Sequence, residues 1–382
     1  MAMDSLLHEG LSWLLPNLGL VVIALGLITA AAIPRVLTPK AATATATATE
    51  TVNPPHENKN ESESEIHPLL DFDVATRPPH PYRPWRSGKF AMTMGVSKVK
   101  PEEWLDLDNK YWQEQELRRQ LLVESRPEVM QLLHGSEAAC IEVLDTVVDY
   151  LTRRYPSLFY RPEGKDGYIY NGLTNLSFKI TAPYELHPLE IAAQLVMEDL
   201  NLLVQGFGPE PDQYYLSASF SMAPAGWYLK ERIGWPLWKI HGPVPLWEEK
   251  LRLSVERFFL RMKPGDIVMR QNFFLQTNNA MFQQEPFANS MLSAPKIEDI
   301  RIRHERQTLR RLPKTGAVLF TVRTYLTPVV DLQDEPDSIR EFLGAVNALP
   351  ESMAKYKGRD VWGEVVESWC KKQLEHTDTD SA

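Results

Sequence analysis

The chain has 382 residues, of which 41 are Lys or Arg and 50 are Asp or Glu, so its formal net charge is −9. Nucleic-acid-binding proteins carry basic patches with interleaved aromatic residues; no such stretch occurs here, which argues against this class of function. The two cysteines, Cys140 and Cys370, cannot form a disulfide framework or a cysteine-based zinc or iron–sulfur site, and they agree with a reducing compartment.

The first predicted element is a membrane-spanning helix over Leu11–Ile33. This segment contains no charged residue and is long enough to cross a hydrocarbon core of about 30 Å. A cleaved signal peptide is the alternative, but residues 1–10 contain Asp4 and Glu9 and no Lys or Arg. Arg35 and Lys40 follow the helix, so we expect a single-pass membrane protein with its soluble domain in the cytosol. The endoplasmic reticulum is a candidate membrane.

Residues 34–80 are predicted to form a disordered tether, because this Ala-, Thr-, Pro- and acid-rich stretch has too little apolar area to offset its ordering entropy. The predicted organisation is therefore a tail at 1–10, the anchor at 11–33, the tether at 34–80, one domain with a helical extension at 81–328, and C-terminal helices and tail at 329–382.

Apolar periodicity predicts the elements of the soluble body. Helices are expected at 102–122, 127–153, 187–203, 246–262 and after 336, and strands at 167–170, 176–181, 214–223, 267–277, 297–310 and 317–328. Three consecutive long strands near the end indicate an α+β fold, in which an antiparallel sheet has helices packed on one face.

Standard cofactor and hydrolase motifs are absent, since the sequence contains no GxGxxG, GxxxxGK[ST], GxSxG or HExxH. The most informative isolated residue is His241, in LWKIHGPVPLWEE. Pro243 and Pro245 restrict the backbone after it, and tryptophans surround it. A rigidly held neutral imidazole in an apolar setting suits axial ligation of a haem iron. A hydrogen-bonded core or helix-capping histidine is the alternative.

Two further groups of polar residues are candidates. If 304–310 is a strand, Glu305, Gln307 and Leu309 point to one face, and His304, Arg306, Thr308 and Arg310 point to the other. Arg306, Arg310, Arg311 and Arg323 could bind propionates, phosphate or acidic substrate groups, or could instead form a salt-bridged strand face. Glu198 and Asp199 interrupt a predicted apolar helix, where either needs an arginine partner or meets an amine substrate.

Five segments occur in an order and spacing that resemble one known family. They are KFAMTMG, EEWLDLDNKYW, HPLEIAAQLVMEDLNLL, IHGPVP and ERQTLRRLPKTGAVLFTVRTYLTP, which together cover about Lys89 to Pro328. They resemble the haem-dependent oxidative N-demethylase family, called the HRQ family in fungi, whose signature appears here as His304, Arg306 and Gln307. The segment Met269–Phe287 departs from the Trp-rich version expected in that family, so the substrate is expected to differ.

The resemblance implies a haem-binding fold of the Per-ARNT-Sim type, with a five-stranded antiparallel sheet and flanking helices enclosing haem b. It also implies the use of dioxygen, and of electrons from NADPH delivered through flavin and iron–sulfur partners, to demethylate a small amine. By resemblance, His241 is the candidate iron ligand, Arg306 and Arg310 are candidate cofactor-binding residues, and Glu198, Arg323 and Tyr325 are candidate catalytic residues.

The leading hypothesis is a membrane-tethered, haem-dependent oxidoreductase or monooxygenase-like enzyme that receives electrons from a separate reductase, as in secondary metabolism of fungi. One alternative is a haem-based gas or redox sensor, because a fold does not fix function. The other is a haem-free interaction protein that keeps only the scaffold.

Overall fold

The computed structural model describes residues 66–286 and 292–380. These residues belong to one compact unit, Lys59–Ala382. The predicted membrane anchor, Leu11–Ile33, lies outside the described residues. Within the described part of the chain, every helix is too short or too polar to cross a bilayer.

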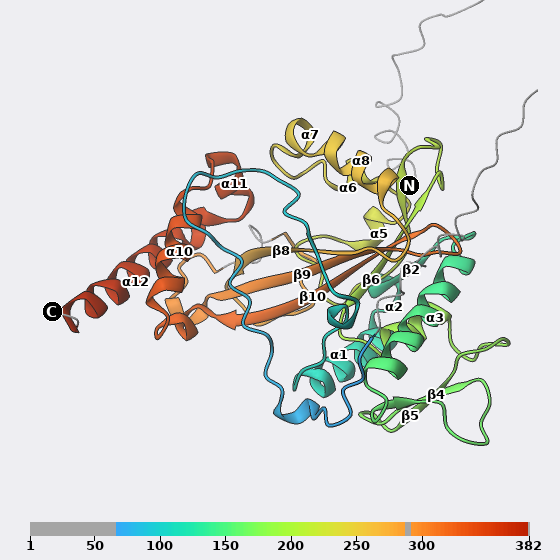
Figure 1. Cartoon of the computed structure of the whole chain (residues 1–382). Coiled ribbons are helices and arrows are strands. Elements are labelled where there is room, and N and C mark those ends of the chain that lie inside the picture. Colours follow the sequence, from blue (N-terminus) through green and yellow to red (C-terminus); the bar gives the residue numbers. More distant parts are fainter. Residues whose placement is uncertain (1–65, 287–291, 381–382) are drawn as a thin grey trace, which may run out of the picture. The chain divides into compact units, whose positions relative to one another are not determined.

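A seven-stranded antiparallel sheet forms the centre of this unit (Figure 1). Its strands, in spatial order, are β1 (Ser97–Lys98), β8 (Ile267–Gln276), β9 (Arg301–Arg311), β10 (Val318–Pro328), β6 (Asp199–Gln205), β7 (Tyr214–Phe220) and β2 (Met130–Leu132). The prediction of an α+β fold with an antiparallel sheet is confirmed. The sheet has seven strands, whereas the family resemblance implied five.

The hairpin of β9 and β10 fixes the register of the long strands. Its turn closes where Leu312 and Ala317 form a backbone hydrogen bond of 2.8 Å, and Gly316 adopts a positive φ of 71° that favours glycine. Thr308 lies directly opposite Thr321, and their hydroxyls are 2.6 Å apart. Alternate residues of each strand therefore point to opposite faces of the sheet, as predicted for 304–310.

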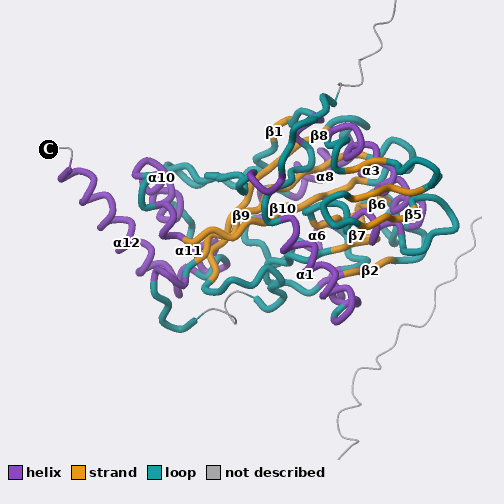
Figure 2. The backbone as a smooth tube through the Cα atoms, turned by 90° about the horizontal axis from the view of Figure 1, so that it is seen from below, coloured by secondary structure: helices purple, strands orange, loops and turns teal. Residues whose placement is uncertain are grey.

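We name the two faces after the helices that cover them. The α1/α3 face carries His304, Arg306, Thr308 and Arg310 of β9, and it is covered by α1 (Tyr111–Glu124) and α3 (Glu137–Arg154). Figures 1 and 2 show α1 lying across this face. Val143, Leu144 and Val147 of α3 are fully buried in the largest apolar core. Short helices α2 (Arg126–Val129) and α4 (Pro188–Ala193) complete this layer.

The α6/α8 face carries Glu305, Gln307 and Leu309 of β9. It is covered by α5 (Leu229–Arg232), α6 (Leu237–Ile240), α7 (Trp247–Lys250) and α8 (Arg252–Arg261). Leu237 and Phe259 of these helices pack against Val268, Leu309 and Val318 of the sheet. The prediction of helices on one face only is therefore wrong. Both faces of β9 are buried from Ile302 to Leu309, which requires a cover on each side.

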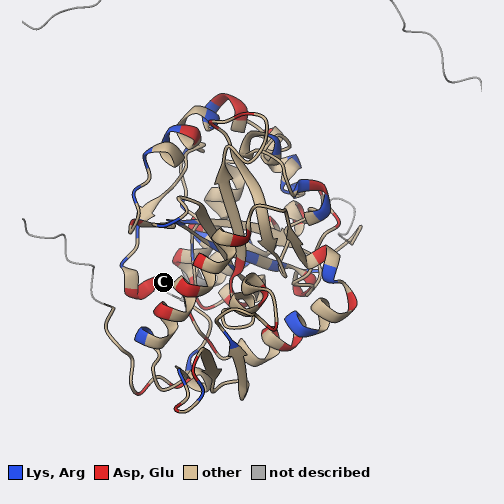
Figure 3. Ribbon diagram, turned by 90° about the vertical axis from the view of Figure 1, so that its right-hand side faces the viewer, with Lys and Arg blue, Asp and Glu red and all other residues tan. Residues whose placement is uncertain are grey.

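Three helices near the C-terminus, α10 (Pro336–Asn347), α11 (Glu351–Tyr356) and α12 (Arg359–Asp380), pack at one end of the long strands (Figures 1 and 2). Phe342 of α10 and Trp362 of α12 share a core with Leu275 and Ile302 of the sheet. The C-terminal helices are therefore built into the same unit as the sheet. Basic and acidic residues are interspersed along the helices of this unit (Figure 3).

The remaining regular elements are short. A separate antiparallel sheet contains β3 (Phe159–Tyr160), β4 (Tyr168–Asn171) and β5 (Leu176–Lys179), close to the strands predicted at 167–170 and 176–181. The 3-10 helices are η1 (Val74–Thr76), η2 (Pro101–Glu103), η3 (Ile297–Asp299) and η4 (Val329–Leu332).

Two predicted helices are wrong in part. The segment 187–203 is helical only in α4, and its second half forms β6, which lies between β10 and β7. An apolar run that is buried on both sides has no unique period, so its spacing also fits a helix. The helix predicted at 127–153 is divided into α2, β2 and α3, with Gly135 at a φ of 96° before α3.

The predicted tether at 34–80 extends too far, because residues 66–80 contact the body. Val74 is buried in the main core, and Ile66, Leu69 and Phe72 pack against it. The backbone N–H of Leu69 also donates to the carbonyl of Arg154 at 2.8 Å. These four apolar residues supply the buried area that the composition of 34–65 lacks.

Candidate functional site

The predicted site residues are divided between the two faces of the sheet. Arg306 and Arg323 lie opposite each other on β9 and β10, and His304 lies opposite Tyr325 in the same way. All four point to the α1/α3 face. His241 follows α6, on the α6/α8 face. The sheet itself therefore separates His241 from the arginines that were expected to act with it.

Arg323 is buried in a network of ion pairs with the N-terminal segment. Its guanidinium lies 2.7 Å from the carboxylate of Asp108 and 2.8 Å from that of Glu114, and all three side chains are buried. The guanidinium also lies 4.5 Å from the ring centre of Tyr325. Burial raises the pKa of Glu114, and the charge of Arg323 opposes this shift. The polar groups of Arg323 thus bind α1 and the residues before it.

Glu198 precedes β6 and is fully buried. Its carboxylate accepts the backbone N–H groups of Asp106 and Met197, each at 3.2 Å. Burial raises the pKa of Glu198, while the charges of Arg323 and Arg306 lower it. The structure therefore brings Glu198 close to the arginine cluster, on the same face. The neighbouring Asp199 points the other way and accepts from Ser221 at 2.7 Å and Met222 at 2.9 Å.

Arg306 and Arg310 contact the segment that leads into α1. Arg306 donates to the carbonyls of Trp104, at 2.8 Å, and Glu103. Arg310 lies over the indole of Trp104, 4.7 Å from the ring centre. A cofactor bound at His241 would be separated from both by the sheet, so the expectation that they hold this cofactor does not fit the arrangement. The catalytic roles of Glu198, Arg323 and Tyr325 stay predictions.

His241 is held in one orientation by two neighbours. Its Nδ1 lies 2.8 Å from the carbonyl oxygen of Leu237, so this nitrogen carries the proton and donates it. The ring stacks on Trp247 with centroids 4.9 Å apart and an interplanar angle of 7°. Burial lowers the pKa of His241 to about 4; the hydrogen bond to Leu237 opposes the shift, and Arg270 adds to it. The imidazole is therefore neutral near pH 7, with the lone pair on Nε2.

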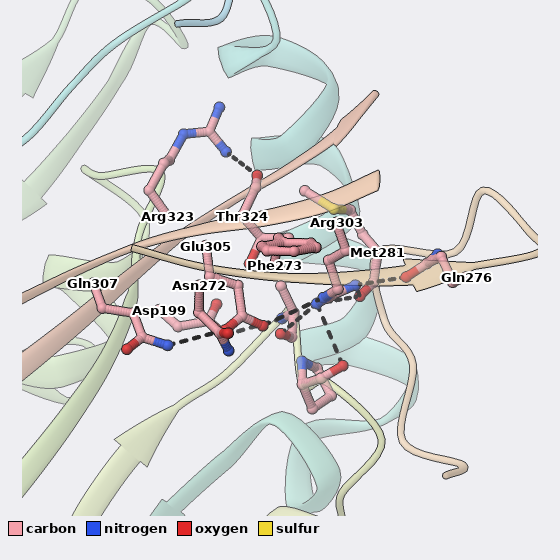
Figure 4. A network of polar contacts seen from close by, with 12 residues as sticks. Asp199, Asn272, Phe273, Gln276, Met281, Arg303, Glu305, Gln307, Arg323 and Thr324 are labelled. Atoms are coloured by element: carbon pink, nitrogen blue, oxygen red, sulfur yellow. Dashed lines mark hydrogen bonds and ion pairs between the residues drawn. The ribbon is translucent and has the colours of Figure 1, made fainter. Parts of the chain in front are cut away.

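Sequence patterns did not single out the polar residues of β8 on this same face. Arg270 lies opposite Gln307, and Asn272 lies opposite Glu305. The Asn272 amide donates to Glu305 at 3.3 Å, and the Gln307 amide donates to it at 2.9 Å. Figure 4 shows Asn272, Glu305 and Gln307 on one side of the strands and Arg323 on the other. The sequence did contain one signal for these residues. Arg270 and Asn272 are polar and occupy alternate positions of a strand inside the sheet.

These residues fit a haem group better than a bare metal ion. In the described part of the chain, no group of three or more His, Cys, Asp or Glu side chains could hold a metal ion. A haem needs one neutral imidazole from the protein, and the ligating histidine usually donates its other ring N–H to a carbonyl. His241 meets both requirements. Ile240, Val255 and Phe320 supply partly buried apolar surface, and Arg270 supplies a cation with its Nε enclosed and unpartnered among the described residues.

In a comparison with protein-family models, residues 95–367 match the family described as haem-dependent oxidative N-demethylase, alpha subunit-like. The matched region includes every strand of the main sheet, His241 and the helices α10 and α11. Because this region is well over half of the 382 residues, the chain belongs to the haem-dependent oxidative N-demethylase, alpha subunit-like family.

Proposed function

We propose that this chain is the haem-binding subunit of an oxidoreductase that removes N-methyl groups from a small amine. Family membership indicates a haem-dependent oxidative N-demethylase-like enzyme. The observation that carries the proposal is the geometry of His241, a neutral imidazole with Nδ1 bonded to Leu237 and its ring stacked on Trp247. In this proposal His241 is the iron ligand, and the sheet with its α6/α8 cover forms a fold of the Per-ARNT-Sim type around haem b.

Haem, when bound, supplies dioxygen activation and the oxidation of the N-methyl group. The chain's own residues would ligate the iron, orient the ligating imidazole and exclude water. The hydrogen bond to Leu237 keeps Nδ1 protonated and directs the Nε2 lone pair away from that carbonyl. Ile240, Val255 and Phe320 lower the local polarity. Arg270 is positioned to neutralise a carboxylate.

Electrons would come from a separate reductase that carries flavin and iron–sulfur groups and oxidises NADPH. The family description, alpha subunit-like, supports a partner subunit. The apolar segment Leu11–Ile33 supports tethering to a membrane, which raises the effective concentration of a reductase in the same membrane. Deleting residues 1–40 should leave haem binding intact and slow turnover in membranes; equal turnover would show that the segment serves location only.

Absorption spectroscopy of the purified full-length protein tests haem ligation. We expect a Soret band with about one haem per chain, lost in His241→Ala. His134→Ala is the matched control, because His134 is exposed and its ring nitrogen contacts the exposed carboxylate of Glu137. Circular dichroism checks that both variants fold. A His241→Ala protein with an unchanged Soret band would overturn the assignment of the ligand.

Activity is tested with the haem-loaded protein, a reductase and NADPH. We expect oxygen consumption and formaldehyde release with methylated amines such as dimethylamine. Haem binding without amine-dependent turnover would favour the sensor hypothesis instead.

A further inference from the structure

The α6/α8 face carries a row of polar residues at the centre of the sheet. Asn272 of β8, Glu305 of β9 and Thr324 of β10 lie directly opposite one another, and Arg270 and Gln307 form the next row. Arg270, Asn272 and Val322 are only half-buried, although they lie on inner strands. These three side chains therefore keep some solvent-accessible surface, whereas Arg306 and Arg323 on the opposite face are buried.

Some hydrogen-bond acceptors in this row lack donors. Among the described residues, Glu305 accepts two amide hydrogens, from Gln307 and Asn272, and forms an ion pair with Arg303, whose Nε lies 3.6 Å away. Among the described residues, Gln307 Oε1 and Thr324 Oγ1 are enclosed and have no hydrogen-bond partner. Gln307 is 8% exposed and Thr324 is 2% exposed. Unpartnered acceptors at this depth are costly unless a ligand supplies N–H donors. A protonated secondary amine supplies two.

Two cations flank the acceptors. Lys357, at the end of α11, is buried; its Nζ donates to the carbonyl of Phe273 at 2.6 Å and lies 3.5 Å from Asn272 Oδ1. Arg270 lies on the other side of Asn272 along β8, and its Nε has no partner among the described residues. Burial lowers the pKa of Lys357 to about 8; Glu305 opposes this shift and Arg270 adds to it.

Arg303, the third nearby cation, already has partners for its terminal nitrogens and forms an ion pair with Glu305. Its terminal nitrogens donate to the carbonyls of Ala223 at 2.6 Å and Met281 at 3.2 Å, and to the side chain of Gln276. The positive charges of Arg270 and Lys357 are therefore left without an equal negative charge beside them. A carboxylate on the ligand would balance them.

We propose that this polar row binds a small substrate that carries both a secondary amine and a carboxylate, an N-methylated amino acid. Glu305 and Gln307 accept the amine hydrogens, and Arg270 and Lys357 bind the carboxylate. The inference rests on the proposed function, because it names the class of amine that the demethylase acts on. A haem propionate offers the same carboxylate chemistry to Arg270 and Lys357, and the experiment separates the two sources.

The experiment uses the full-length, haem-loaded protein and isothermal titration calorimetry. The probes are sarcosine and N-methylalanine, with dimethylamine as the amine without a carboxylate and acetate as the carboxylate without an amine. We expect both amino acids to bind at least about tenfold more tightly than dimethylamine. Glu305→Gln should weaken both classes about tenfold or more. Lys357→Met should weaken only the amino acids.

Matched variants separate local effects from unfolding. Lys355→Met changes an exposed lysine two residues away, and Glu163→Gln changes an exposed carboxylate. Both should leave every affinity unchanged. Arg270→Gln repeats the test from β8, so the inference does not depend on whether Lys357→Met folds. Equal affinities for sarcosine and dimethylamine, or no effect of Lys357→Met and Arg270→Gln, would overturn it.

The Soret band is recorded for each sample. If Lys357→Met or Arg270→Gln loses haem and keeps its sarcosine affinity per haem, these residues hold propionates and the inference fails. A wild-type protein without a Soret band refutes the proposed function. Calorimetry on that same haem-free protein would then still show whether the polar row binds the amino acids.

Discussion

His241 and Trp247 stack almost in parallel, with ring centroids 4.9 Å apart and an angle of 7° between the planes. Trp247 is buried, and it opens α7 two residues after Pro245. The backbone of Leu246, between them, has a φ of 65°, which a leucine rarely adopts. A strained turn and a fixed indole together set the plane of the imidazole.

Trp247→Leu should therefore weaken haem binding without removing the ligand. Side chains that orient a metal-bound histidine are typically worth about 10- to 100-fold in affinity. We expect haem to transfer to an acceptor apoprotein faster than from the wild type. The loss of haem affinity should be smaller than in His241→Ala. Trp112→Leu, a half-exposed tryptophan on α1, is the control and should leave the rate unchanged. An unaltered rate in Trp247→Leu would contradict the role of the stack.

His304 should make the stability of the protein depend on pH. It is buried beside Trp85, neither ring nitrogen has a hydrogen-bond partner among the described residues, and burial lowers its pKa to about 3. In the unfolded chain this histidine has a pKa of about 6.5. Between pH 6.5 and 3 it is therefore protonated in the unfolded state and neutral in the folded state. The free energy of unfolding is therefore lowered as pH falls through this window.

His304→Phe removes this titratable side chain. Urea unfolding of wild type and variant from pH 7 to pH 4 should show a flatter pH dependence in the variant. The difference should be on the order of a few kcal/mol. Parallel curves would show that His304 does not titrate in this way. His134→Phe, at an exposed site, should leave the slope as it is.

Arg323→Met should destabilise the fold strongly. It leaves Asp108 and Glu114 buried without their cation, and breaking a buried pair in this way typically costs about 3–5 kcal/mol. Arg153→Met removes an exposed pair with Asp149 and should cost less than about 1 kcal/mol. The free energy of unfolding in urea measures both. A small effect of Arg323→Met would mean that water enters and solvates the two carboxylates.

Glu142→Ala should destabilise the turn of the β9–β10 hairpin, although Glu142 lies outside the sheet. The Glu142 carboxylate, on α3, accepts the backbone N–H of Lys314 and of Thr315, at 2.6 Å and 2.8 Å, and also the Thr315 hydroxyl. Losing these charge-assisted bonds should cost about 2–3 kcal/mol in thermal or urea unfolding. Asp145→Ala, whose contact with the Lys314 ammonium is exposed, should be nearly neutral. Equal effects of the two variants would contradict this account.

The sequence by itself determined the features that depend on local pattern and on family motifs. Alternation identified β10 within a residue and placed Glu305 and Gln307 on the opposite side of β9 from Arg306. The order of IHGPVP and ERQTLRRLP indicated the family that the family model then showed. These signals are carried by neighbouring residues, so no folded structure is needed to see them.

Only the tertiary structure decided which helix covers which face. A period of two separates two sets of side chains but does not say which set meets α6 and which meets α1. That choice depends on contacts such as Arg323 with Asp108, 215 residues apart along the chain. It placed His241 on the face of Glu305 and Arg270 rather than beside Arg306. It also placed Glu198, which was predicted to be helical, directly before the buried strand β6. Because β6 is buried on both sides, its sequence lacks the alternation that would have distinguished a strand from a helix.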